Sequence, residues 1–235
     1  MIDGKISILS NVYSHSTSQN PSNSELKNVC VTGYNSFEVN FDENQINTWV
    51  TKANTNPIIF HDRPDFGMRN IIKVDMQDIA ISNKDILITY GADPCVIMAV
   101  YNVFTHTAAL THISAEVDIN TLLPCLQKIA ENKPHALTIY LAGGNGAGKS
   151  DAAYVINLVE QSNYCYTLYS KVSEEQGQLG IDPVTGHLFD FAPTAFLKTY
   201  ENLFKNTDTY TLGLYDESQR TFYPPDEKFK TFFNT

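Results

Sequence analysis

A cysteine and a histidine in the middle of the chain have the residue types of a nucleophile and its base. Cys95 lies in I-T-Y-G-A-D-P-C-V-I-M-A-V, at a corner between two apolar runs, and His112 follows in L-T-H-I after a further apolar run and a turn. A free thiol titrates near ~8.5, and a neighbouring imidazole lowers that pKa by stabilising the thiolate. The pair is therefore chemically sufficient for acyl transfer through a thioester.

The residues around this pair supply candidates for the supporting roles. Pro94 cannot donate a backbone hydrogen bond and favours an extended Asp93, so the first free amide beside the thiol belongs to Cys95 itself and is a candidate oxyanion donor. Thr89, at the end of the preceding apolar run, is the predicted third group that orients the imidazole. His106 is a competing base, but it lies in T-H-T at the expected turn and ranks below His112.

The order of several motifs resembles that of a known enzyme family. They are V-D-M-Q-D-I-A-I-S, the Cys95 corner, L-T-H, T-I-Y-L-A-G-G, L-G-I-D-P-V-T-G-H-L-F and L-G-L-Y-D-E-S-Q-R. From about Ile71 to Tyr223 the chain resembles protein N-terminal asparagine amidohydrolases, and the spacing of Thr89, Cys95 and His112 resembles that of the chemoreceptor glutamine deamidases. The catalytic domain of the cytotoxic necrotizing factors likewise uses a Cys and a His on a carboxamide.

The resemblance implies a reaction and a fold. It implies a cysteine-dependent deamidase that converts an Asn or Gln carboxamide of a protein or peptide to a carboxylate with release of ammonia, an N-terminal Asn being one candidate substrate. It implies a layered α/β/β/α sandwich with mixed β-sheets, and we expect no cofactor. Asp93 and the glycine pair Gly143 and Gly144 are the predicted substrate-binding residues. The corner reads A-D-P-C where the asparagine amidohydrolases have small hydroxyl residues, which leaves Asn and Gln both open.

A second motif supports a different function. The segment G-G-N-G-A-G-K-S over 143–150 matches the phosphate-binding loop G-x-x-x-x-G-K-[ST] in full and is predicted to lie between a strand and a helix. The alternative nucleotide-binding residues are Gly143, Gly148, Lys149 and Ser150. A nucleotide hydrolase also needs several parallel strands and an acidic Mg²⁺ partner, for which Asp216 and Glu217 are the candidates near the end of the chain. The alternatives are therefore a P-loop nucleotide-binding protein or a non-enzymatic binding module of the same fold.

The surrounding periodicity predicts the elements that position these residues, in a mixed α/β (α+β) chain. Helices are expected over 43–53 after the cap Asp42, and over 119–133, 150–162 and 193–205. Strands are expected over 71–76, 79–82, 85–90, 95–104, 108–113, 136–144 and 164–172, with a hairpin over 178–191 and a strand pair over 209–224. The nucleophile corner, the histidine and the glycine pair all fall at strand ends.

The composition limits the kind of protein this is. With 235 residues, 43% of them hydrophobic, the chain is expected to form one domain over 1–235, with 14–28 as an exposed Ser/Asn-rich loop. The net charge of −10, with scattered basic residues, argues against nucleic acid as a partner. No apolar run is long enough to cross a membrane, and the N-terminus lacks the pattern of a secretory signal.

The cysteine and histidine positions predict neither disulfides nor a metal site. Cys30, Cys95, Cys125 and Cys165 are widely spaced and form no C-x-x-C, which is typical of reduced thiols in the cytoplasm. Cys125 has the spacing of a buried helix residue. The sequence leaves open the oligomeric state, the target, and whether the protein acts in its own cell or in a host cell.

Overall fold

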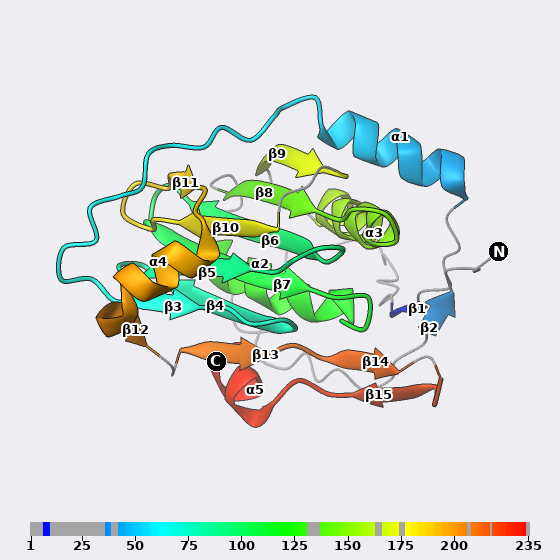
Figure 1. The fold of residues 1–235 in the computed structure, drawn as a ribbon. Coiled ribbons are helices and arrows are strands. Elements are labelled where there is room, and N and C mark those ends of the chain that lie inside the picture. The colour runs from blue at the N-terminus through cyan, green and yellow to red at the C-terminus, as the bar shows by residue number, and fades with distance from the viewer. Residues whose placement is uncertain are drawn as a thin grey trace, which may run out of the picture. The chain divides into compact units, whose positions relative to one another are not determined.

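The protein divides into two compact units, Met1–Asn40 and Phe41–Thr235 (Figure 1). The computed structural model describes residues 7–9, 36–38, 42–130, 137–162, 166–173, 177–205, 208–216 and 218–233. In the first unit, β1 (Ser7–Leu9) pairs antiparallel with β2 (Ser36–Glu38). The predicted loop over 14–28 lies outside the described residues, and every predicted site residue belongs to the second unit.

The second unit has both helices and strands, which confirms the mixed α/β class. Its helices are α1 (Glu43–Ala53), α2 (Leu122–Ala130), α3 (Gly148–Gln161), α4 (Pro193–Thr199) and α5 (Glu227–Phe233), with 3-10 turns at Ile119–Thr121 and Glu201–Leu203. Its strands are β3 (Ile71–Lys73), β4 (Asp78–Ser82), β5 (Ile86–Tyr90), β6 (Val96–Asn102), β7 (Thr107–Ile113), β8 (Leu137–Gly143), β9 (Tyr166–Val172), β10 (Gln178–Ile181), β11 (Leu188–Phe189), β12 (Phe204–Lys205), β13 (Thr209–Thr211), β14 (Leu214–Asp216) and β15 (Thr221–Tyr223).

Two mixed sheets contain most of the described strands. The five-stranded sheet has the order β11-β10-β5-β3-β12, and its β3 pairs parallel with both β5 and β12. The six-stranded sheet has the order β13-β4-β7-β6-β8-β9, antiparallel except for β8 and β9. The hairpin of β6 and β7 forms the centre of the six-stranded sheet, as the apolar runs on either side of the 103–106 turn predict.

The two sheets pack face to face through one buried apolar cluster. Members from the five-stranded sheet include Leu87, Leu179 and Ile181, and members from the six-stranded sheet include Ala80, Ile97, Ala99, Ala108, Leu110 and Ala142. Because so many side chains on the inner face of the six-stranded sheet are alanines, the two sheets can approach closely. A polar side chain on one sheet can therefore reach one on the other.

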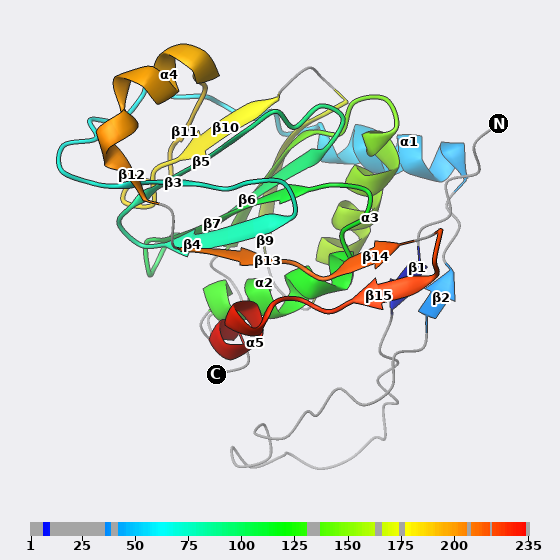
Figure 2. The same cartoon turned by 60° about the horizontal axis from the view of Figure 1, so that its bottom comes forward.

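Helices cover the outer faces of both sheets (Figure 2). Phe196 of α4 packs with Phe66 and Phe189 against the five-stranded sheet. Helices α2 and α3 contact the six-stranded sheet at β6, and α2 also contacts β7. Cys125, on α2, is fully buried, as the helical spacing predicts. No helix of the described residues combines the length and apolarity that crossing a membrane requires.

Local signals predicted some boundaries well and others poorly. Helix α1 spans the expected residues, and Asp42 forms a reciprocal capping box with Gln45. The helix predicted over 193–205 is wrong in its second half, because it ends at Thr199 and Phe204–Lys205 pairs with β3. Pairing with the edge of the five-stranded sheet at β3 stabilises these residues as a strand more than their helical propensity stabilises a helix. Helix α5 was not predicted.

Candidate active site

The central hairpin brings Cys95 and His112 to the same end and the same face of the six-stranded sheet. His112 on β7 is the strand partner of Ile97 on β6. Cys95 precedes Ile97 by two residues and packs against the same inter-sheet cluster. Cys95 lies one residue before β6, and its packing against that cluster places its side chain on the inter-sheet side, to which Thr89 also holds His112.

Thr89 reaches His112 from the facing sheet and fixes its ring. Thr89 Oγ1 donates to the Val74 carbonyl oxygen at 2.8 Å and lies 3.0 Å from His112 Nδ1. A threonine hydroxyl has one hydrogen, which Val74 takes, so the second bond requires that Nδ1–H donates to Thr89. The neutral ring then carries no proton on Nε2, which is left as the acceptor.

The Nε2 atom of His112 is buried and makes no hydrogen bond among the described residues. The residue is only 3% exposed, and leaving a polar atom unpaired at that depth costs about 1–3 kcal/mol. The thiol of Cys95 is half-buried and makes no hydrogen bond to Nε2 in this structure. An unpaired buried acceptor on the face that carries a cysteine is an arrangement suited to taking a proton during a reaction.

Burial favours the neutral forms of both Cys95 and His112. Burial lowers the pKa of His112, with Asp75 partly opposing that effect. Burial raises the pKa of the Cys95 thiol, and the carboxylates of Asp151 and Asp93 raise it further. The sequence predicted a thiolate stabilised by the imidazole. In the structure, burial and, after it, the neighbouring negative charges favour the protonated thiol, so a reaction at Cys95 would require transfer of the thiol proton to a base such as His112.

The predicted substrate-binding residues lie along the backbone next to Cys95. Gly143 ends β8 directly opposite Val96, and the Gly144 amide donates to the Cys95 carbonyl oxygen at 2.8 Å. Asp93 is exposed two residues before the cysteine. The structure therefore brings Asp93, Gly143 and Gly144 together at the Cys95 corner.

The competing base is at the opposite end of the hairpin. His106 lies in the turn between β6 and β7, where its Nδ1 is 2.8 Å from the Tyr101 hydroxyl. Strand β6 runs from Val96 to Asn102, which at about 3.3 Å per residue separates this turn from the Cys95 corner by roughly 20 Å. His106 is not part of the site around Cys95.

The phosphate-loop segment has the predicted strand, loop and helix order, but its groups bond within the protein. The Gly148 and Lys149 amides donate to the carbonyl oxygens of Asn145 and Gly146 at 3.1 and 3.3 Å. The Lys149 ammonium donates to Asn47 Oδ1 of α1. The Ser150 hydroxyl donates to the Ala147 carbonyl oxygen, 2.9 Å away. A phosphate-binding loop directs such groups at its ligand.

The proposed Mg²⁺ partner of that loop is only partly described. Asp216 Oδ1 accepts from the hydroxyl and the amide of Ser218 at 2.7 and 2.9 Å, and Glu217 lies outside the described residues. The described Asp216 carboxylate therefore caps its own turn.

Asp151, which no sequence motif marks, lies near Cys95. It belongs to the first turn of α3 and is only 4% exposed. Burial raises the pKa of Asp151 to about 7, and its charge in turn raises the pKa of Cys95. An acidic residue in the first turn of a helix is ordinary, which is why the sequence did not mark it. The available signal was its position next to A-A-Y-V, a buried run.

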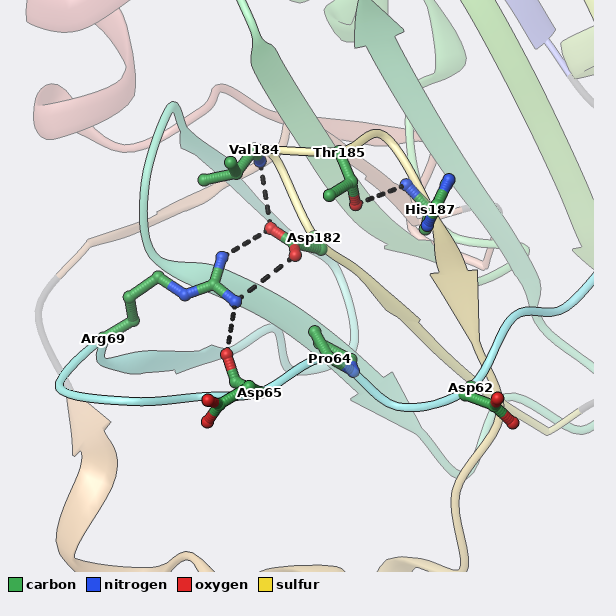
Figure 3. Close-up of a pocket in the computed structure, with 8 residues that line it drawn as sticks. All are labelled: Asp62, Pro64, Asp65, Arg69, Asp182, Val184, Thr185 and His187. Carbon is green, nitrogen blue, oxygen red and sulfur yellow. Dashed lines mark hydrogen bonds and ion pairs between the residues drawn. The ribbon is translucent and has the colours of Figure 1, made fainter.

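A separate hollow lies at the other end of the five-stranded sheet (Figure 3). Asp182 lines this hollow and directly follows Ile181, which pairs with Leu87 at the start of β5. Thr89 lies towards the other end of β5. The Arg69 guanidinium pairs there with the Asp182 carboxylate at 2.6 Å. His187 stacks on the His61 ring with 3.8 Å between ring centroids. The hollow has no cysteine among its lining residues, and we place the candidate site at Cys95.

Neither a cluster of metal ligands nor a protein relative helps to identify the candidate site. Among the described residues, no three His, Cys, Asp or Glu side chains cluster as metal ligands would. Comparison with protein-family models finds no match, and neither does comparison with curated proteins.

Proposed function

We propose that this protein is a cysteine-dependent amidohydrolase that converts an Asn or Gln carboxamide of a protein or peptide to a carboxylate and releases ammonia. Cys95 is the nucleophile, His112 the base, and Thr89 the residue that positions the imidazole. The observation that carries the proposal is the bond between Thr89 and His112 Nδ1, which leaves Nε2 as a buried, unpaired acceptor on the face that carries the thiol.

The proposed reaction follows from the protonation states of these groups. As the Cys95 sulfur bonds to the amide carbon, the thiol proton passes to His112 Nε2, and backbone donors such as the Cys95 amide hold the oxyanion. The imidazolium then gives this proton to the amide nitrogen, the C–N bond breaks, and ammonia leaves. Water that loses a proton to His112 attacks the thioester, which yields the carboxylate and restores the thiol.

The layered fold is consistent with this proposal. Two face-to-face sheets with helices on both outer faces correspond to the α/β/β/α sandwich that the resemblance to asparagine amidohydrolases and glutamine deamidases implies. We propose that the chain is of this cysteine-hydrolase type. No cofactor takes part in the proposed reaction.

The direct test is ammonia release from a library of peptides with internal or N-terminal Asn or Gln. Cys95→Ala should lower the rate by at least about 10³-fold, since no other group can form the thioester. Cys125→Ala is the matched control, because that thiol is fully buried in α2, and it should remain active. Ammonia release by Cys95→Ala at the wild-type rate would refute the proposal.

A second pair of measurements separates the alternatives. For an amidohydrolase, Lys149→Ala should keep ammonia release and lose only the contact with Asn47. A P-loop protein instead requires that the wild type bind ATP or GTP in calorimetry and that Lys149→Ala abolish it. A binding module of the same fold requires that neither ammonia release nor nucleotide binding be observed.

A further inference from the structure

The first turn of α3 presents one face to the nucleophile corner. A Cβ atom on Gly148 would collide with the Pro94 carbonyl oxygen, and a Cβ on Gly144 would lie 3.2 Å from the Ala152 Cβ. Residues three and four apart share a helix face, so Asp151 lies on the same face as Gly148 and Ala152. Asp151 therefore faces the corner that carries Cys95.

The surroundings of Asp151 are unusual for a carboxyl group. Burial is the only cause of its raised pKa, while Cys95 and Asp93 are the titratable groups of the corner opposite it. Buried carboxyls are normally paired with a cation or several donors, and a perturbed carboxyl beside a nucleophile is characteristic of functional sites. The reaction of Cys95 and His112 described above does not use this group.

We propose that Asp151 is a specificity-determining residue that accepts a hydrogen bond from the N–H of the substrate carboxamide and repels a carboxylate. This inference rests on the proposed amidohydrolase function and names the feature by which the site distinguishes substrate from product. A carboxamide offers two N–H donors to the Asp151 carboxylate, whereas the carboxylate product offers only acceptors and a negative charge. The same contact favours amide binding and product departure.

Two isosteric alkylating reagents test the inference without turnover. Iodoacetamide carries a carboxamide and iodoacetate a carboxylate. In both, the Cys95 thiolate bonds to the carbon that bears iodine, and iodide leaves. Mass spectrometry of the peptide that contains Cys95 gives the two alkylation rates. Their ratio is divided by the same ratio for glutathione. This normalised ratio does not depend on the fraction of Cys95 that is thiolate, because both reagents react with the same thiolate. At pH 8 we expect wild type to favour iodoacetamide by about tenfold or more, from charge repulsion at close range.

The variants and the pH dependence make the test specific. Asp151→Asn should bring the ratio close to that of glutathione, and the wild-type ratio should decline as the pH falls below about 7, where Asp151 becomes protonated. Asp118→Asn is the control, since Asp118 is 5% exposed and its carboxylate accepts from the Asn120 amide at 3.1 Å. It should leave the ratio unchanged.

The outcomes separate this inference from the proposed function. A wild-type ratio equal to that of glutathione at pH 8, or a ratio that does not change from pH 5.5 to 8, overturns the role of Asp151 even if Asp151→Asn fails to fold. Ammonia release together with such a flat ratio refutes the inference alone. A discriminating ratio that Asp151→Asn abolishes, together with no ammonia release from any peptide, refutes the deamidase and confirms the selectivity of Asp151 at Cys95.

Discussion

At the scale of single residues, Thr89 determines what His112 can do. Its hydroxyl gives its hydrogen to the Val74 carbonyl oxygen and so presents a lone pair to His112 Nδ1. The imidazole is thereby held in the tautomer with a free Nε2, the form needed for a base that faces a thiol. Burial adds to this effect by lowering the pKa of His112, which keeps the ring neutral.

Replacing Thr89 with Val tests this positioning role. The variant keeps the shape of the side chain and removes both hydrogen bonds, so kcat for ammonia release should fall about tenfold or more while KM changes little. The nitrogen chemical shifts of His112 should at the same time show loss of the single Nδ1–H tautomer. Unfolding should require about 1–2 kcal/mol less free energy.

A matched control for Thr89 is available on the hairpin that carries His112. Thr111 is fully buried beside His112, and its hydroxyl donates to the Asp78 carbonyl oxygen at 2.9 Å. Thr111→Val should cost similar stability but leave kcat and the His112 tautomer unchanged. Equal kcat in the two variants would show that Thr89 has only a structural role.

At the scale of secondary-structure elements, the close approach of α3 to the Cys95 corner organises the site. Gly148 allows this contact because a side chain there would collide with Pro94, and Gly144 allows the neighbouring contact with Ala152. Gly148, one of the two glycines that match the phosphate-binding motif, therefore has a packing role, and so does Gly144 next to the other. They let the first turn of α3, and with it Asp151, reach the nucleophile.

Replacing Gly148 with Ala should push α3 away from the corner. Overpacking of this kind costs about 1–3 kcal/mol of unfolding free energy, and ammonia release should fall with it because Asp151 and Cys95 move apart. Gly177→Ala is the control, since the nearest atom to its added Cβ, the Ala92 amide nitrogen, is 3.9 Å away. If thermal unfolding of the two variants is indistinguishable, the packing role assigned to Gly148 is wrong.

At the scale of the whole molecule, the site lowers the stability of the fold. Asp151 has a pKa of 3.8 when unperturbed and about 7 in the folded protein. Its folded state therefore holds a proton that the unfolded chain has already lost, and stability decreases as the pH rises from about 4 to 7. At about 1.4 kcal/mol per pKa unit, the cost above pH 7 is on the order of 4 kcal/mol.

Asp151→Asn should recover this stability in a pH-dependent way. Relative to wild type, its unfolding free energy should rise by a few kcal/mol at pH 8 and by little at pH 4.5, because only the ionised carboxylate is destabilising. Urea unfolding at both pH values measures the difference. Asp93 is exposed, so Asp93→Asn is the control and should have the unfolding free energy of the wild type at both pH values. An equal gain for Asp151→Asn at both pH values would contradict the conclusion that the ionised carboxylate destabilises the fold.

The sequence alone determined the local secondary structure and the order of the candidate site residues along the chain. Apolar runs rich in branched and aromatic residues predicted β5, β6, β7 and β8, and the capping residue Asp42 predicted the start of α1, since these signals act over a few neighbouring residues. The same patterns placed Cys95 at a corner and His112 on the returning strand. The boundary of α4 could not be predicted, because its final residues pair with a strand distant in the sequence.

Only the tertiary structure decided how the site is built. The bond between Thr89 and His112 joins two different sheets, and Asp151 reaches Cys95 through the packing of α3, so neither relation leaves a pattern among neighbouring residues. The raised pKa of the thiol was likewise decided by burial and by the carboxylate of Asp151, which folding brings near it, and only Asp93 is already its neighbour in the sequence. Charge effects depend on distance and burial, and a linear sequence specifies neither between residues far apart along it.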